Sequence, residues 1–417
     1  MKRVSLVLAG LLVPALASAQ LPDPSTRAMG MGGAYASLAR GYEAVAWNPA
    51  MLAALGRPGF TIGLPHVNFE FGSNAYGFSD VRKYANTYLT SADKQALLDK
   101  ITGSTLTIRS LIGAEPLGLS VGPFAVMVGT SGEVDAGIGK DAVRLALNGN
   151  APQIGTLSTF TAAGSNGRAW AATTAAGSFA LPFRLPLGRL SVGATYKYII
   201  GNFLGTATDL GSQVGFSPLF SATEAGQALY TDYGRNCTIK PLGTGTCGGK
   251  AGNGYGVDLG ATLQLGRGGV TLSAVVVNAL GKMTWDASRL SYDRTLRQST
   301  QTSSGTVQDT VLLQESLHGQ ASISANPQAA ALRDSLLANA DFARLVRVGF
   351  ALRKGQLTVA AQGQLRLKEG LDQQSSRLLS AGIEYRLLGI LPLRVGASSD
   401  FAGATTLSAG TGIQLLG

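Results

Sequence analysis

The residue types that most often carry chemistry are scarce in this chain. Two histidines, His66 and His318, and two cysteines, Cys237 and Cys247, are all that the 417 residues contain. A zinc site would therefore have almost no histidine or cysteine ligands to draw on. The motifs H-E-x-x-H and C-x-x-C do not occur, and no nucleophile stands beside either histidine in the sequence. The sequence predicts no catalytic residues, no metal and no cofactor, and a protein that is not an enzyme.

One glycine pattern matches a nucleotide-binding motif. Gly243, Gly245 and Gly248 satisfy the G-x-G-x-x-G spacing of dinucleotide-binding loops,. Such a loop follows a strand and opens a helix, whereas these glycines follow Pro241 and precede no helical pattern. We therefore interpret the match as chance.

The first 19 residues have the features of a secretory signal peptide. Lys2 and Arg3 precede an apolar run that ends in Ala17-Ser18-Ala19, an A-x-A cleavage site,. The chain is therefore expected to leave the cytoplasm. In an oxidising compartment, the nearby pair Cys237 and Cys247 in a loop of Gly, Thr and Asn predicts a disulfide that closes a small surface loop.

The composition is unusual for a soluble domain. Charged residues make up 14% of the chain and 56 residues are glycine, against roughly 25% and 7% in ordinary domains. No stretch after the leader has 18 consecutive apolar residues, so no spanning helix is predicted. An exported, charge-poor chain of this kind fits a transmembrane β-barrel. The net charge of +10 comes from scattered Lys and Arg, which favours contact with outer-membrane lipid and lipopolysaccharide rather than with nucleic acid.

Alternation with a period of two provides the strand prediction. From Leu190 to Ile200 the even positions are apolar, and the odd ones from 191 to 197 are Ser, Gly, Thr and Lys,. A soluble sandwich also alternates, but its solvent face would carry frequent Lys and Glu. Here the polar face is rich in Gly, Ser, Thr and Gln, which suits a narrow lumen. We predict an all-β fold, a transmembrane antiparallel β-barrel of about 14 strands. The candidate strands are residues 59–71, 104–113, 115–121, 123–138, 168–182, 188–204, 214–222, 254–266, 269–286, 344–354, 356–369, 376–388, 391–401 and 404–416.

The first strand and the long connections carry further signals. The alternation slips at Pro65-His66, which indicates either a bulge or kink in the first strand or an ordinary strand end. His66 on this strand either lines the bore or, as is more common for a lone histidine, is a satisfied interior residue. The connections have helical patterns at 79–103 and 327–342. Their apolar stripes either form an external groove for a greasy ligand or pack the loops onto the barrel rim.

The stretch from Arg27 to Ala50 is a poor strand and a poor soluble helix, so it needs surrounding structure to hold it. Its glycine-rich start and its Asn-Pro-Ala end resemble the N-terminal segment of the FadL-like outer-membrane barrels. These include the OmpP1/FadL/TodX transporters and the PorV-like secretion barrels. The resemblance implies a hatch inside the barrel. The hatch or gating residues it implies are Gly30, Gly32, Gly33, Trp47, Asn48, Pro49 and Ala50.

The expected organisation follows from these signals. We predict a signal peptide at 1–19, a hatch or plug at 20–58 and a barrel at 59–417. Long extracellular loops are expected at about 79–103, 205–253 and 287–343.

Two functions remain open. The first is an outer-membrane channel, in a Gram-negative-type bacterium, for uptake of hydrophobic small molecules such as a long-chain fatty acid or hydrocarbon. A fatty acid or detergent-like ligand would then occupy the bore. The second is a PorV-like barrel that transports nothing small and instead docks or shuttles secreted proteins with an envelope protein partner.

Overall fold

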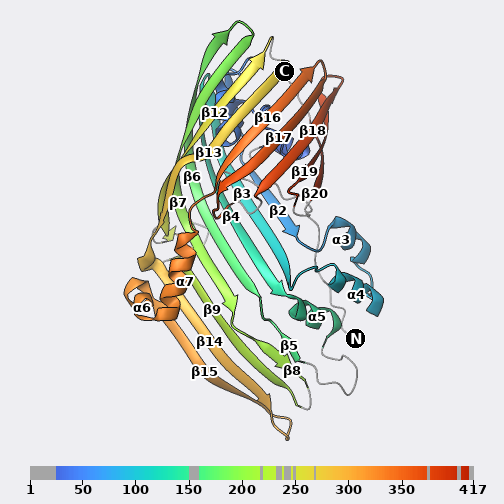
Figure 1. Ribbon diagram of the computed structural model, residues 1–417, viewed down its shortest axis with the longest axis vertical. Coiled ribbons are helices and arrows are strands. Elements are labelled where there is room, and N and C mark those ends of the chain that lie inside the picture. Colours follow the sequence, from blue (N-terminus) through green and yellow to red (C-terminus); the bar gives the residue numbers. More distant parts are fainter. Residues whose placement is uncertain are drawn as a thin grey trace.

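Figure 1 shows the computed structural model, a tall antiparallel sheet that curls around the N-terminal segment. The structure describes residues 25–149, 159–216, 219–231, 237–238, 246–247, 250–266, 269–372, 376–401 and 405–412. The signal peptide predicted at residues 1–19 lies outside these ranges.

The barrel wall follows the order of the chain. Both β1 and β2 pair with β3, and each later wall strand pairs antiparallel with the next one up to β20. The wall strands are β1 (Phe60–Gly63), β2 (His66–Ser73), β3 (Thr105–Val121), β4 (Phe124–Gly139), β6 (Asn166–Leu185), β7 (Gly188–Asp209), β12 (Gly252–Leu265), β13 (Val270–Trp285), β16 (Arg344–Lys354), β17 (Leu357–Lys368), β18 (Arg377–Leu387), β19 (Leu391–Ser399) and β20 (Thr405–Thr411).

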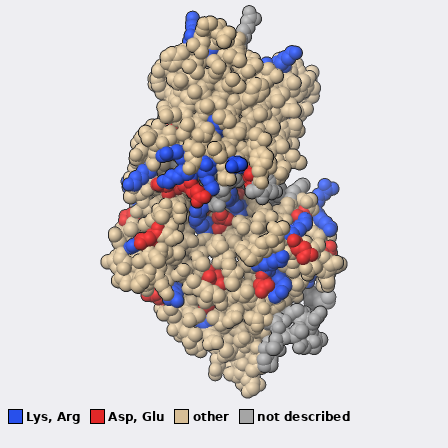
Figure 2. Space-filling view, viewed as in Figure 1, with Lys and Arg blue, Asp and Glu red and all other residues tan. Residues whose placement is uncertain are grey.

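The two faces of the wall confirm the predicted alternation. On β7, Tyr196 and Tyr198 are exposed outside, whereas Thr195 and Lys197 are buried inside. On β12, β17 and β18 the exposed side chains are likewise mostly apolar and the buried ones mostly polar, which is the reverse of a soluble protein. Figure 2 shows the consequence on the face in view, as a band nearly free of charged side chains in the upper half of the molecule. An antiparallel barrel with an apolar exterior and a polar interior is therefore the fold.

A second group of strands extends the wall at one end. Residues 188–201 of β7 pair with β12, but residues 205–209 pair with β9 (Ser221–Thr231). From β9 the sheet continues to β14 (Leu290–Gln301) and β15 (Val307–His318). The short strands β5 (Thr159–Thr161) and β8 (Gln213–Gly215) pair with each other, and β8 also pairs with β9. This extension forms the lower half of the molecule in Figure 1.

The strand number differs from the expected fourteen for two reasons. The candidates 104–113 and 115–121 are one strand, β3, whose register with β4 shifts between Ala114 and Leu117. The candidate 214–222 contributes to β8 and β9 and so belongs to the extension. If β1 and β2 are counted as one broken strand, the described wall has twelve positions.

The connections differ in length at the two ends. Turns of a few residues join the wall strands at the upper end in Figure 1, and all the long connections lie at the lower end, where shorter ones join β17 to β18 and β19 to β20. Among the described residues no helix is both long and apolar enough to cross a bilayer. The helices of the long connections are α3 (Phe78–Tyr84), α4 (Ser91–Asp99), α5 (Lys140–Asn148), η3 (Ala287–Arg289), α6 (Gly319–Ala325) and α7 (Pro327–Ala338).

The wall has a break and a seam at its first strand. β1 and β2 keep one register with β3, but Leu64 and Pro65 between them are unpaired, and Pro65 stands opposite Pro116. Because proline has no N–H to donate, two facing prolines remove ladder bonds from both strands. In the described residues β20 pairs only with β19, and β1 and β2 pair only with β3. We call this missing pairing between the first and last wall strands the seam. The break therefore lies on the strand that borders the seam.

Candidate functional site

The N-terminal segment, residues 25–54, is largely buried against the wall, and we call this segment the plug. It consists of α1 (Thr26–Gly30), η1 (Gly41–Glu43), α2 (Ala44–Trp47) and η2 (Pro49–Ala53). The Ser25 hydroxyl caps α1 by accepting the N–H of Ala28, and Pro49 occupies the first turn of η2, where its missing N–H costs nothing,. Most of the apolar side chains of the plug are fully buried, and they form the largest core cluster of the molecule. The plug is thus packed as an interior.

Three cross-strand glycine pairs in the wall receive the plug. Each pair consists of directly opposed residues on neighbouring strands, and a Cβ on any of the six would collide with plug atoms. Such a contact requires the plug to lie directly against the wall backbone. The three pairs are Gly382 with Gly396 beneath Met31–Gly32, Gly193 with Gly260 beneath Asn48–Pro49, and Gly63 with Gly118 beneath the Tyr42 ring.

The predicted hatch glycines lie at the first of these contacts. Gly32 and Gly33 have φ of +65° and +83°, a conformation that side chains other than glycine rarely adopt,. A Cβ at Gly32 would lie 2.6 Å from the backbone N of Ala397 on β19, and one at Gly30 would lie 3.1 Å from the Arg394 side chain. The three glycines therefore form a turn that fits against the wall.

The Asn-Pro-Ala triplet is anchored by a buried amide. Asn48 Nδ2 donates to the carbonyl of Ala36 (3.1 Å) and to Thr262 Oγ1 on β12 (2.9 Å), and its Oδ1 accepts the N–H of Ala50 (3.1 Å). Both ends of one side chain thus tie together two parts of the plug and the wall. Because all these groups are away from water, losing the amide would leave several of them unsatisfied.

Trp47 is the aromatic centre of the plug. Its ring meets the Tyr35 ring edge-on at 5.5 Å between centroids, and the Arg347 guanidinium lies 5.0 Å from its centroid. Arg347 on β16 is itself buried; its Nε donates to Gln364 Oε1 (2.9 Å) and its Nη1 donates to the Ala46 carbonyl (3.3 Å). A cation over an indole face is favourable, the more so when both groups are desolvated.

A charged cluster holds the start of the plug to the wall. Glu384 on β18 is buried and accepts Arg27 Nε and Nη2 at 2.7 and 2.8 Å. It also accepts Nε of Arg394 at 2.7 Å and Nε of Arg386 at 3.3 Å. Arg27 belongs to α1, so this carboxylate bridges plug and wall through bidentate, charge-assisted hydrogen bonds.

A second closure lies towards the extension. The indoles of Trp170 and Trp285 donate to the carbonyls of Leu371 and Ala340 at 3.0 and 2.9 Å. The Trp170 ring packs edge-on against Phe342 at 5.3 Å. These residues belong to a second buried cluster, with α6 and α7 packed against it. The bore is therefore filled at two levels.

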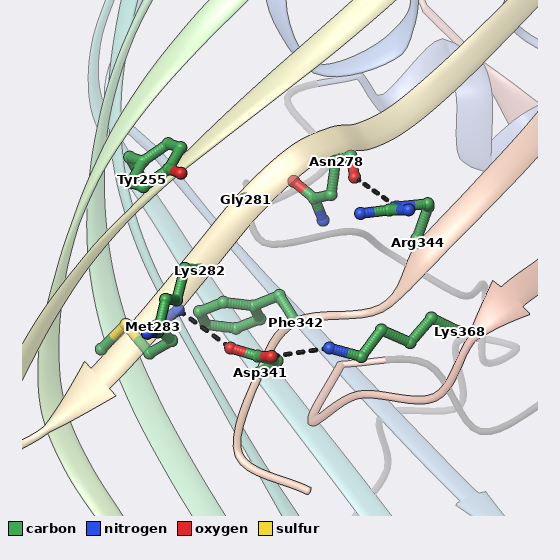
Figure 3. Close-up of a pocket in the computed structure, with 9 residues that line it drawn as sticks. All are labelled: Tyr255, Asn278, Gly281, Lys282, Met283, Asp341, Phe342, Arg344 and Lys368. Atoms are coloured by element: carbon green, nitrogen blue, oxygen red, sulfur yellow. Dashed lines mark hydrogen bonds and ion pairs between the residues drawn. The ribbon is translucent and has the colours of Figure 1, made fainter.

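A small cavity lies beside this second closure, where β13 leaves β16 (Figure 3). Its volume is about 20 Å³, room for a water molecule, whereas a benzene site needs about 150 Å³. Burial opposes ionisation of Asp341 in its lining, but hydrogen bonds from Lys368 Nζ (2.7 Å) and the Met283 N–H (2.9 Å) outweigh it. The pKa of Asp341 is therefore lower than that of an ordinary carboxyl group,. The cavity is polar and too small for a hydrocarbon.

The helical stripes of the long connections pack inward. Leu97 and Leu98 of α4 are buried, and Leu98 clusters with Leu106 of β3 and Val143 of α5. Of the two interpretations of the 79–103 stripe, the structure supports packing onto the rim.

The two histidines lie far apart in the chain and in different surroundings. His66 Nε2 lies 4.0 Å from Glu115 Oε2 on the neighbouring strand. His318 Nδ1 lies 3.0 Å from Ser291 Oγ, and its Nε2 lies 3.3 Å from Ser316 Oγ. The pairing of β14 with β15 creates this Ser–His contact, which sequence neighbours do not reveal. Among the described residues no group of three or more His, Cys, Asp or Glu is placed to hold a metal.

The two cysteines face each other across a short hairpin. β10 (Cys237–Thr238) pairs antiparallel with β11 (Thr246–Cys247), and Cys237 stands directly opposite Cys247. The Gly243, Gly245 and Gly248 pattern lies outside the described residues. The disulfide stays a prediction.

Comparisons with known proteins give one family and several similar folds. The chain is similar to the toluene transporter TodX of Pseudomonas putida, with 12% identity, a TM-score of 0.38 and coverage of 93% of this chain and 94% of that chain. For the toluene transporter TbuX of Ralstonia pickettii the identity is 11% and the TM-score 0.33, with coverage of 91% of this chain and 93% of that chain. For a FadL homologue of Pseudomonas aeruginosa the identity is 12% and the TM-score 0.26, with coverage of 95% of this chain and 96% of that chain. At these scores the likenesses carry no weight for function.

No curated protein matches the chain. The family model that matches, described as "Family of unknown function (DUF5723)", spans residues 49–344, from the Asn-Pro-Ala triplet to the start of β16. Because this range is well over half of its length, the chain belongs to the family of unknown function DUF5723.

Proposed function

We propose that this protein is an outer-membrane channel that takes up hydrophobic small molecules, such as a long-chain fatty acid or hydrocarbon, in a Gram-negative-type bacterium. The apolar exterior supports insertion in a bilayer, since only a closed or covered wall of strands can cross one without helices. The long connections would face the outside of the cell and the short turns the periplasm, as in other barrels.

The observation that carries the proposal is the break in the first wall strand of a plugged barrel. A channel for polar solutes needs an open bore, whereas this bore is filled at two levels. The break at Leu64–Pro65 is flanked by the outward apolar side chains Ile62 and Val67, both more than half exposed. A side exit there would deliver cargo into lipid, which favours apolar molecules by about 25 cal/mol for each Å² that leaves water.

The experiment is uptake by cells that lack their own fatty-acid transporter and express the full chain. We expect radiolabelled oleate to enter faster than in cells with an empty vector, while a polar solute such as maltose enters at the same rate. A bulky Leu64→Trp variant should slow oleate entry, whereas Val348→Trp, at an exposed position on distant β16, should not. Oleate entry equal to that of the empty vector would reject the proposal.

The alternative, a docking barrel, rests on the extension. The segment 287–343 forms β14, β15, α6 and α7 beyond the apolar band, and β15 pairs only with β14 among the described residues. A strand edge of this kind accepts an extended segment of another protein. A large envelope protein that co-purifies with the full chain, and is lost when residues 302–306 at the hairpin tip are replaced by proline, would favour docking.

A further inference from the structure

Basic side chains mark the lower border of the apolar band on four neighbouring strands. Each lies within two residues of the last outward apolar side chain of its strand, on the side of the long connections: Leu280 on β13, Val346 on β16, Leu367 on β17 and Leu379 on β18. We call these four residues the basic girdle; they are Lys282, Arg344, Lys368 and Arg377. Figure 2 shows Lys and Arg gathered at this height, directly below the uncharged band.

The position of the girdle matches the surface of a bilayer. Arg344 and Lys354 stand at the two ends of β16, ten residues apart. At roughly 3.3 Å per residue this is about 33 Å along the strand, or about 25 Å along the normal for a strand tilted by about 40°. That is the height of the apolar belt of outer-membrane barrels. Arg344 would therefore lie at one headgroup layer and Lys354 at the other.

The girdle carries positive charge that the protein leaves uncompensated. Asp341 neutralises Lys368, and Arg344 Nε donates to the Asn278 carbonyl at 3.0 Å. The side chains of Lys282 and Arg377 make no hydrogen bond or ion pair with the other described residues, although the charge of Lys282 also acts on Asp341. A net positive cluster at a membrane border attracts anionic headgroups, by about 1 kcal/mol for each basic residue.

The cavity between these residues contains a second, independent feature. Asn278 is only 4% exposed, its φ is +51°, and its Oδ1 has no hydrogen-bond partner. Figure 3 shows the Asn278 side chain at the cavity, its backbone carbonyl bonded to the Arg344 guanidinium, and Lys282 and Lys368 elsewhere in the lining. A buried acceptor without a donor is costly, and a hydroxyl of a bound ligand would satisfy it. The site thus offers cations for an anion and one acceptor for a hydroxyl.

We propose that the basic girdle and the Asn278 cavity bind the phosphorylated sugar headgroup of lipopolysaccharide. The proposal rests on the membrane placement in the proposed function, because long connections face outward and the outer leaflet carries this lipid. Its phosphates would pair with Lys282, Arg344 and Arg377, and a sugar hydroxyl would donate to Asn278 Oδ1. Free inorganic phosphate lacks both the hydroxyl and the acyl chains that hold a lipid at the border of the band.

The test is binding of diphosphoryl lipid A to the full chain in maltoside micelles, measured by native mass spectrometry. We expect the double variant Lys282→Gln/Arg377→Gln to bind lipid A roughly 30-fold more weakly. The matched control Lys354→Gln removes a charge at the opposite border and should bind like the wild type. Phosphatidylcholine should bind equally to all three proteins.

Three results would overturn the proposal. One is equal lipid A affinity in the double variant and the wild type; another is an equal loss in Lys354→Gln, which would mean diffuse attraction. The third is displacement of lipid A by millimolar inorganic phosphate. The uptake assay separates this site from transport, because the double variant should import oleate at the wild-type rate, whereas Leu64→Trp should bind lipid A normally.

Discussion

Gly193→Ala tests whether the glycine pairs of the wall hold the plug in place. Gly193 lies in the middle of β7, in a backbone conformation that alanine adopts freely, so the wall itself should tolerate the change. The added Cβ would lie 2.6 Å from the carbonyl carbon of Pro49 and 2.7 Å from the N of Ala50. These are backbone atoms, which cannot rotate aside as a side chain can.

The expected size of the effect follows from these distances. Ordinary contacts begin at 3.4 Å, so the Pro49–Ala50 backbone must withdraw by roughly 1 Å, which overpacking studies place at about 1–3 kcal/mol. That withdrawal also strains the Asn48 hydrogen bond to Thr262. If the cost acts on the docked plug alone, the undocked population rises about 5- to 150-fold.

The assay is single-channel recording of the purified full chain in planar lipid bilayers. An undocked plug opens the bore to ions, so we expect brief openings to become more frequent in Gly193→Ala by that factor. The matched control is Gly177→Ala, on the outer face of β6, where an added Cβ meets nothing within 4 Å. Equal opening frequencies in the two variants, both correctly inserted, would refute the role of the glycine pair in docking.

Three further predictions concern the charged groups and the cysteines. Glu384→Gln removes the carboxylate that pairs with Arg27, leaves partly buried guanidiniums without their bonded counter-charge, and should lower the unfolding midpoint and raise the opening frequency,. Because the pKa of Asp341 is lowered, its ion pair contributes stability above the ordinary carboxyl range and loses it as pH falls through the depressed pKa,. The unfolding midpoint of Asp341→Asn should accordingly lie below the wild type at pH 7 and converge with it in strong acid. Alkylation of the unreduced protein should label neither Cys237 nor Cys247, and labelling of both would disprove the disulfide.

The barrel could be predicted from sequence because alternation is a local signal. The pattern from Leu190 to Ile200 states which face of β7 is apolar, and the structure turns that face outward. The sequence also indicated an interruption at Pro65-His66, since proline cannot donate a hydrogen bond to a neighbouring strand. The position of Pro116 opposite Pro65 could not be predicted from the sequence, because the register between residues about 50 positions apart is a property of the assembled sheet.

The candidate site was predicted in outline only. The glycine-rich turn and the Asn48 anchor lie in the stretch that the resemblance indicated. The wall glycines that receive them, such as Gly193 and Gly260, looked like ordinary small residues of a polar face. Their importance depends on being cross-strand partners beneath the plug, which requires both the register and the position of the plug. The sequence signal for such pairs is a glycine at an inward-facing position on each of two consecutive strands.

The polarity of the interior argues for a route through the side of the wall. Lys197 and Asp258 face the bore and form a buried ion pair at 2.7 Å, and Glu133 pairs there with Arg109 at 3.1 Å. An apolar molecule that passed the whole length of this bore would displace water from charged groups without replacing their hydrogen bonds, which is unfavourable at every step. A molecule that leaves at the break beside Leu64, where the Tyr42 ring of the plug covers Gly63 and Gly118, reaches lipid without crossing the whole bore. Under the proposed function, hydrophobic cargo therefore favours the lateral exit over an axial path, and a Leu64→Trp variant that imports oleate at the full rate would exclude the lateral exit.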